Sequence, residues 1–112
     1  MNKVVYNTSW GMFSISITAM RWLAENGCEE TKTKALNMLK KVPYDGYTYY
    51  SPDFERHDPD LVRCVETLGR KANGMNASLE VKELKGNRYR IDEYDGNEEV
   101  YEPEDEEYII IK

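Results

Sequence analysis

The sequence predicts a single α+β domain in which about three helices pack on an antiparallel sheet with a C-terminal β-meander. Apolar residues recur at helical spacing in the middle of the chain, whereas apolar and polar residues alternate in its last third, as in strands. A length of 112 residues and an apolar content of 40% are enough for one modest core and too little for two domains. We therefore expect residues 1–112 to form one domain, with a final strand near residues 108–111.

The first half of the chain contains two predicted strands and two predicted helices. Residues 3–6 are a β-branched and aromatic run typical of a strand. Ser16 suits the N-cap of a first helix, which has apolar residues at helical spacing: Ile17, Met20, Leu23 and Ala24. A second helical pattern covers residues 30–41, with acidic residues at its start and lysines at its end, as the helix dipole favours. A short strand is expected near residues 47–50.

The third helix has the clearest boundaries in the sequence. Asp58 is a typical N-cap, Pro59 fits the first helical position, and Gly74 is expected to end the helix. The apolar residues between them form one stripe: Leu61, Val62, Val65, Leu68 and Ala72. This stripe predicts the buried face of the helix.

The register of the C-terminal meander follows from its two turns. A three-residue loop at residues 85–87 would place Val81 opposite Ile91 on one face of the sheet. The Asp-Gly dipeptide at residues 95–96 is a strong signal for a two-residue hairpin, and it places Ile91 opposite Val100. The two turns therefore agree on a single apolar row.

The same register places three carboxylates in one row on the exposed face. Glu80, Asp92 and Glu99 fall opposite one another, and like charges in this position destabilise a sheet by roughly 0.2–1 kcal/mol. One interpretation is that Lys82 and Arg90 in the neighbouring row neutralise these carboxylates. The alternative is that the row is a recognition surface, since carboxylates on two adjacent strands match the charge spacing of a nucleic-acid backbone and would mimic DNA.

Acidic residues are concentrated at the C-terminal end of the sequence. Residues 92–112 contain ten Asp and Glu and one Lys, whereas residues 1–91 contain fourteen Lys and Arg and eleven Asp and Glu. This asymmetry favours a partner protein with a basic surface and disfavours direct binding to nucleic acid or to an anionic membrane. The residues expected to bind the partner are acidic or tyrosine side chains: Glu80, Asp92, Tyr94, Glu99, Tyr101, Glu102, Glu104, Asp105, Glu106 and Glu107.

The sequence also indicates the compartment. The N-terminal residues lack the apolar core of a secretory signal, and no run of 18 or more apolar residues is present. Cys28 and Cys64 are 36 residues apart and do not form the dense cysteine framework of a small secreted protein. We expect a cytoplasmic protein with reduced thiols.

No recognisable catalytic or cofactor motif is present in the sequence. His57 is the only histidine, and it has no serine or cysteine nucleophile close to it in the sequence. Glycine-rich phosphate loops and a complete EF-hand pattern are absent. We therefore expect neither enzymatic activity nor a cofactor. Zinc is the remaining alternative, because Cys28, His57 and Cys64 are suitable ligand types, although they lack the short spacings of common zinc sites.

A small-ligand site is a second alternative. The loop that contains Trp10 and Gly11 leads toward the first helix, whose N-terminal N–H groups are able to hold a phosphate, and Arg56 would assist. Under this hypothesis the protein sequesters a nucleotide signal. The opposing interpretation is that the aromatic residues of the loop pack into the core.

Three segments of the chain are distinctive: VVYNT at residues 4–8, HDPDLV followed by ANG within residues 57–74, and IDEYDG at residues 91–96. In these segments the chain resembles a family of small uncharacterised proteins of tailed phages and prophages, and residues 28–55 are outside the resemblance. The resemblance implies a phage accessory protein. By analogy we expect a counter-defence inhibitor of the anti-CRISPR kind, whose acidic face covers the basic DNA-binding surface of a host nuclease. A structural or regulatory phage protein is a further alternative.

Overall fold

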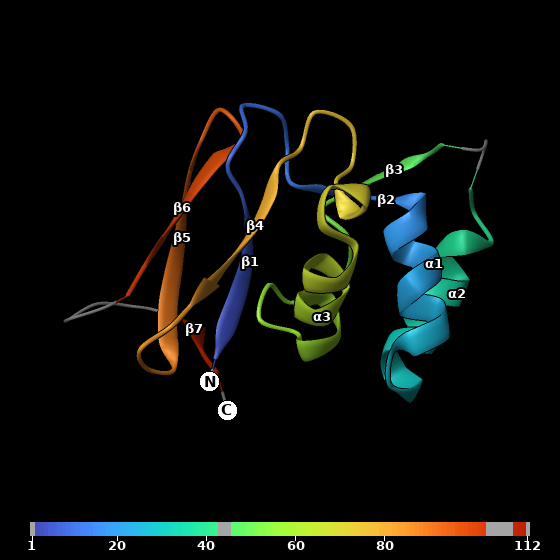
Figure 1. Ribbon diagram of the computed structural model, residues 1–112, viewed down its shortest axis with the longest axis horizontal. Helices are drawn as coiled ribbons and strands as arrows, with labels where there is room; N and C mark the ends of the chain where they lie inside the picture. Colours follow the sequence, from blue (N-terminus) through green and yellow to red (C-terminus); the bar gives the residue numbers. More distant parts are fainter. Residues whose placement is uncertain (1, 43–45, 103–108, 112) are drawn as a thin grey trace.

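The computed structural model describes residues 2–42, 46–102 and 109–111, and it confirms the α+β class. In Figure 1, β5 and β6 lie on one side, β1 and β4 in the middle, and α3 followed by α1 and α2 on the other side. The helices are α1 (Ile17–Asn26), α2 (Glu29–Leu39) and α3 (Pro59–Leu68), with a 3-10 helix at Gly69–Ala72. The strands are β1 (Lys3–Asn7), β2 (Ser14–Ser16), β3 (Thr48–Tyr50), β4 (Leu79–Glu83), β5 (Arg88–Tyr94), β6 (Asn97–Tyr101) and β7 (Ile109–Ile110).

Strand β1 contributes to both hydrophobic cores of the protein. Val5 packs in the larger core with the helices, whereas Val4 packs in the smaller core with Tyr89 and Val100. Both valines are fully buried. Successive side chains of a strand point to opposite faces. The consecutive valines therefore allow one strand to serve two cores.

The predicted helix starts are confirmed, but the end of α3 differs from the prediction. The side-chain oxygens of Ser16 and Asp58 accept hydrogen bonds from first-turn N–H groups of α1 and α3. Helix α3 ends at Leu68 and not at Gly74. Gly69 has a φ of +58°, a left-handed conformation that glycine adopts without steric cost, and the chain continues as a 3-10 helix.

The hairpin of β5 and β6 has the predicted register. Ile91 lies opposite Val100 across the two strands. The turn residues Asp95 and Gly96 have φ angles of +52° and +91°. Positive φ at both central residues is what a two-residue hairpin turn of type I′ requires. The Asp-Gly signal was therefore sufficient to predict this part of the sheet.

The predicted pairing of β4 with β5 is wrong. Strand β4 pairs with β1, so Val81 lies opposite Val5 and not opposite Ile91. Strand β5 pairs with β6 along one edge and with β7 along the other. The alternation of apolar and polar residues in β4 is compatible with any antiparallel partner. In the structure this partner is β1, whose side chains pack in both cores. Residues 85–87 consequently connect two sheets.

The predicted final strand is present as β7, which pairs with β5 opposite Arg88 and Tyr89. Residue 108, the start of the predicted strand, lies outside the described residues.

An ion pair between the partly buried Arg56 and the buried Glu98 connects the loop before α3 with β6. Two guanidinium nitrogens of Arg56 donate to the two carboxylate oxygens of Glu98 at 2.7 and 2.9 Å. Glu98 is 6% exposed, and its Oε1 also accepts the backbone N–H of Asn7 at 2.8 Å. The guanidinium lies 3.5 Å from the ring centroid of Phe13. The buried charge of Glu98 and the partly buried charge of Arg56 therefore compensate each other.

Asn7 extends this network to the loop after β1 and to the hairpin turn. Its side chain is fully buried, and Nδ2 donates to the carbonyls of Gly11 and Gly96 at 2.8 Å each. Its Oδ1 accepts the backbone N–H of Ser78 at 2.8 Å. One carboxamide thus holds together three chain segments that are distant in sequence.

Replacing Asn7 with Ala should destabilise the protein by about 3 kcal/mol, because several buried polar groups lose their partners together. Asn37→Ala is the matched control, since Asn37 is exposed on α2 and alanine favours helix formation. Urea denaturation of both variants measures the two free energies of unfolding. A loss of less than about 1 kcal/mol for Asn7→Ala would show that the network is not a major source of stability.

Asp60 joins the start of α2 to α3. Its Oδ2 accepts the backbone N–H of Cys28 at 2.9 Å, and its Oδ1 accepts from Arg63 at 2.5 Å. Burial by itself would raise the pKa of Asp60, but the N–H of Cys28 and the guanidinium of Arg63 outweigh burial and lower the pKa from 3.8 to about 2.

The stabilisation that comes from Asp60 should depend on pH. Because its folded-state pKa is lowered, the stabilisation is present above pH 3.8 and is lost as the pH falls through about 2. The difference in free energy of unfolding between the wild type and Asp60→Asn should be about 2 kcal/mol near neutral pH and should vanish below about pH 2. Urea denaturation at a series of pH values measures this difference. A difference that stays constant down to pH 2 would contradict the assignment.

Candidate functional site

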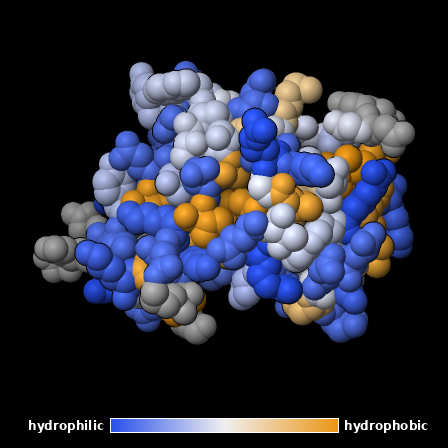
Figure 2. Space-filling view, viewed as in Figure 1, coloured by the Kyte–Doolittle hydropathy of each residue, from blue (hydrophilic) through white to orange (hydrophobic). Residues whose placement is uncertain are grey.

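Two of the predicted partner-binding carboxylates lie opposite each other on the β5–β6 hairpin. Asp92 pairs in register with Glu99, and both side chains are exposed. Tyr94 and Tyr101 are 77% and 40% exposed on the same two strands. In the view of Figure 2, the side of the molecule formed by β5 and β6 is predominantly hydrophilic, and apolar residues gather toward the middle. The hairpin therefore presents a charged surface with isolated aromatic residues.

These residues surround a hollow of about 270 Å³, which we call the hairpin hollow. Its lining is acidic and aromatic: Trp10, Asp92, Glu93, Tyr94, Asn97, Glu99 and Tyr101. Trp10 is 65% exposed and lies edge-to-face with Tyr94, with ring centroids 6.1 Å apart. The hollow thus combines exposed aromatic rings with carboxylates.

Trp10 reaches the hairpin because the loop after β1 packs tightly on the hairpin turn. Asn97 donates from Nδ2 to the carbonyl of Thr8 at 2.8 Å. A Cβ on Gly96 would lie 2.0 Å from the carbonyl oxygen of Gly11, so only glycine permits this approach. The position of Trp10 against the hairpin is therefore set by backbone contacts.

The carboxylates of the hairpin hollow already have intramolecular partners. Arg90 lies 3.0 Å from Asp92 through Nε, and its guanidinium lies 5.3 Å from the ring centroid of Tyr101. Tyr101 donates its hydroxyl to Glu99, and this hydrogen bond raises the pKa of Tyr101. Neutralisation by Arg90 was one interpretation of the sequence, whereas Lys82 instead donates to the carbonyl of Val100 at 3.1 Å. The hairpin itself thus already places one guanidinium beside a tyrosine ring and a carboxylate.

The structure places other predicted partner-binding residues elsewhere. Glu80 lies on β4 opposite Tyr6, because β4 pairs with β1, so Glu80 does not extend the row of Asp92. Glu102 accepts the backbone N–H groups of Lys85 and Gly86, which gives it a structural role. The remaining predicted residues lie outside the described part of the chain: Glu104, Asp105, Glu106 and Glu107.

The alternative ligand site at Trp10, Gly11 and Arg56 is divided between two environments. Arg56 is held by Glu98 and lies over Phe13. Gly11 packs against the hairpin turn and Asn76, while Trp10 lines the hairpin hollow. An anion at this position would have to displace a buried carboxylate from Arg56.

The three candidate zinc ligands have separate surroundings. Cys28 is exposed at the start of α2, whereas Cys64 is buried and donates to the carbonyl of Ala19. His57 Nδ1 lies 2.8 Å from the hydroxyl of Tyr89. Within the described residues, no three His, Cys, Asp or Glu side chains are grouped closely enough to hold a metal ion.

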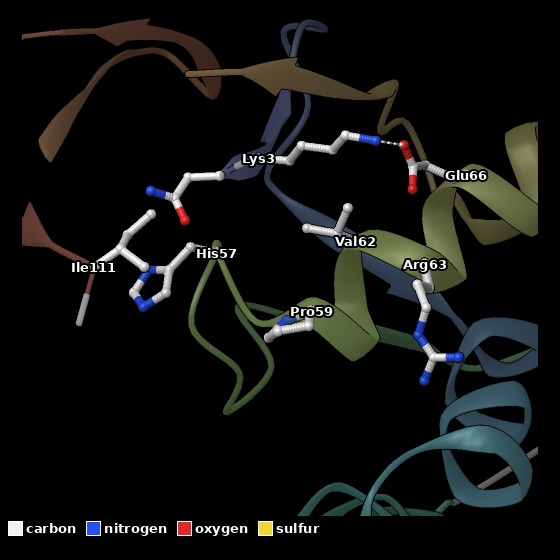
Figure 3. Close-up of a pocket in the computed structure, with 8 residues that line it drawn as sticks. Lys3, His57, Pro59, Val62, Arg63, Glu66 and Ile111 are labelled. Carbon is white, nitrogen blue, oxygen red and sulfur yellow. Dashed lines mark hydrogen bonds and ion pairs between the residues drawn. The ribbon is translucent and has the colours of Figure 1, made fainter. Parts of the chain in front are cut away.

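A larger cavity, of about 440 Å³, lies beside α3 (Figure 3). Residues from three distant parts of the sequence line it: Asn2, Lys3, His57, Pro59, Val62, Arg63, Glu66 and Ile111. Sequence reasoning considered His57 as a catalytic base and as a zinc ligand, and it missed Lys3 and Glu66. No local signal was available, because the cavity depends on how β1, α3 and the end of β7 pack together.

Comparison with known proteins gave no matching protein family, curated protein or solved structure. Among the helices in the described ranges, none has the length and apolar character needed to cross a bilayer.

The two thiols should react at very different rates. Burial raises the pKa of Cys64 to about 12, and the reactive form of a thiol is its thiolate. Dithionitrobenzoate should therefore modify Cys28 rapidly in the native protein and Cys64 only after unfolding in guanidinium chloride. Absorbance of the released thionitrobenzoate counts the reacted thiols, and rapid reaction of both would contradict the described packing.

Proposed function

We propose that this protein is a non-enzymatic binding protein that engages a basic surface of another protein through the β5–β6 hairpin and Trp10. The observation that carries this proposal is the hairpin hollow, in which exposed rings of Trp10, Tyr94 and Tyr101 stand beside the carboxylates of Asp92 and Glu99. Carboxylates attract a cation, and aromatic faces bind one with roughly 0.5–2 kcal/mol. The hollow therefore suits a lysine or arginine side chain.

The size of the hairpin hollow supports a protein partner. A volume of about 270 Å³ is below the range of roughly 300–1,000 Å³ that is typical of small-molecule pockets. A hollow of this size instead suits one side chain of a partner, with the surrounding hairpin surface forming the remainder of the contact. Tryptophan, tyrosine and arginine are also the residues that most often dominate the free energy of binding at interfaces.

The charge distribution supports the same class of partner. The chain has a net charge of −6, and residues 92–112 contain ten of its 21 acidic residues. Such a surface attracts a basic partner over a distance comparable to the Debye length, about 8 Å at physiological salt. The complex should therefore form faster at low ionic strength than at high ionic strength.

The resemblance to phage proteins supports a more specific proposal for the partner. We propose a host protein with a basic nucleic-acid-binding surface, such as a CRISPR nuclease in the cytoplasm of the infected cell. The hairpin would inhibit this protein by occupying the surface that nucleic acid needs. The chain would then be a counter-defence protein with no reaction of its own.

Reversing Asp92 and Glu99 to Lys should weaken the complex at least about tenfold and make its affinity less dependent on salt, because the carboxylates that face the partner's cations are lost. The partner is first isolated by affinity capture from a host lysate, and its dissociation constant is then measured by calorimetry at several salt concentrations. Trp10→Ala should also weaken the complex, with little change in its dependence on salt.

The matched control reverses two exposed acidic residues on the helical side, Glu25→Lys with Asp53→Lys. This variant has the same net charge as the hairpin variant, so it separates a local contact from a general charge effect. It should bind within about twofold of the wild type. Equal weakening by the two double variants, or none by the hairpin variant, would refute the proposed binding face.

A further inference from the structure

The cavity beside α3 has the size and the lining of a small-molecule site. Its volume of about 440 Å³ is within the range of roughly 300–1,000 Å³ that is typical of such sites. It shares no lining residue with the hairpin hollow. A ligand of this cavity would therefore contact none of the residues that line the hairpin hollow.

The lining of the cavity combines apolar and charged side chains. Pro59, Val62 and Ile111 supply the apolar contacts. Figure 3 shows Lys3 extending across the cavity toward Glu66, and the two charged groups are 2.7 Å apart. A molecule with an apolar body and one charged group has complementary contacts with both kinds of side chain.

His57 is held in a defined orientation at the edge of the cavity. Its Nδ1 lies 2.8 Å from the hydroxyl of Tyr89, which is fully buried. Burial raises the pKa of Tyr89 to about 12, so the hydroxyl keeps its proton and is able to donate to Nδ1. When Nδ1 accepts this hydrogen bond, the ring carries a hydrogen on Nε2, which gives the edge of the cavity an N–H donor.

The charges of the lining favour an anion over a cation. The cavity is lined by two cationic residues and one acidic residue, in a chain whose net charge is −6. Arg63 is held at the far wall, where it donates to Asp60 and to the carbonyl of Asn26. Lys3 is paired with Glu66, but both side chains are more than 30% exposed. Partly exposed pairs contribute little free energy, so a ligand is able to compete for Lys3.

We propose that this cavity binds a small organic anion, whose carboxylate or phosphate group pairs with Lys3 Nζ in place of Glu66. The apolar part of the molecule packs against Pro59, Val62 and Ile111. Glu66 limits the affinity, because its carboxylate competes with the ligand for Lys3.

The test is a titration of ¹⁵N-labelled protein followed by nuclear magnetic resonance of the His57 ring. Benzoate and phenyl phosphate are the anionic probes, and benzyl alcohol and benzylamine are matched neutral and cationic probes. At least one anion should cause saturable shifts at His57 and Lys3, and the two anionic probes distinguish a carboxylate site from a phosphate site. Absence of saturable shifts with both anions, or equal binding of benzylamine, would overturn the proposal.

Two variants with opposite expected effects make the test specific. Lys3→Met should weaken anion binding about tenfold, because it removes the charged donor and keeps the apolar stem. Glu66→Gln should strengthen binding roughly threefold, because Lys3 is released from its internal partner. Lys71→Met, at an exposed position of the 3-10 helix, is the control and should bind as the wild type does.

Measuring both variants distinguishes a loss of the binding contact from a folding defect. Glutamine is as good a helix former as glutamate, so Glu66→Gln should fold even if Lys3→Met does not. A general loss of structure weakens binding and cannot strengthen it. Weaker binding of the anions by Glu66→Gln would therefore contradict the proposed competition.

Discussion

The bidentate ion pair between Arg56 and Glu98 is the interaction on which the arrangement of this protein depends. It connects the loop before α3, which belongs to the larger core, with β6 of the smaller core. Removing one member of a buried pair typically costs about 3–5 kcal/mol, because the other charge remains without compensation. Here the geometry satisfies both groups, since Glu98 also accepts the N–H of Asn7 and Arg56 lies over Phe13. A polar connection thus joins two apolar cores.

This connection explains how the candidate binding face is held in position. Strand β6 carries Glu98 inward and Glu99 outward, so the residue that anchors the hairpin is adjacent to one that faces a partner. Asn7 fixes the loop that carries Trp10 against the turn at Gly96. A face that is ordered before binding loses little conformational entropy when a partner binds, which favours affinity. The structural network and the proposed function therefore depend on the same few residues.

Local signals in the sequence were sufficient for some of these features. The two N-caps and the hairpin turn depend only on residues close to them in the sequence, and each was predicted: Ser16, Asp58 and the Asp-Gly turn at residues 95–96. The strand that pairs with β4 is instead decided by the packing of distant parts of the chain. The alternating pattern of β4 does not indicate which strand that is. Arg56 and Trp10 illustrate the same limit. Their neighbours Glu98 and Tyr94 are more than 40 residues away, so the loop before the first helix suggested a ligand site that the packing divides.

The central claim is that the Arg56–Glu98 pair holds the hairpin and the loop of Trp10 on the rest of the molecule. Amide hydrogen exchange of an Arg56→Met variant tests it most directly, because methionine keeps an apolar side chain over Phe13 and removes the charge. We expect amides of β6 and of residues 8–12 to exchange at least about tenfold faster, with α1 and α2 exchanging as in the wild type. Unchanged protection of β6, or an equal loss of protection in the helices, would contradict the claim.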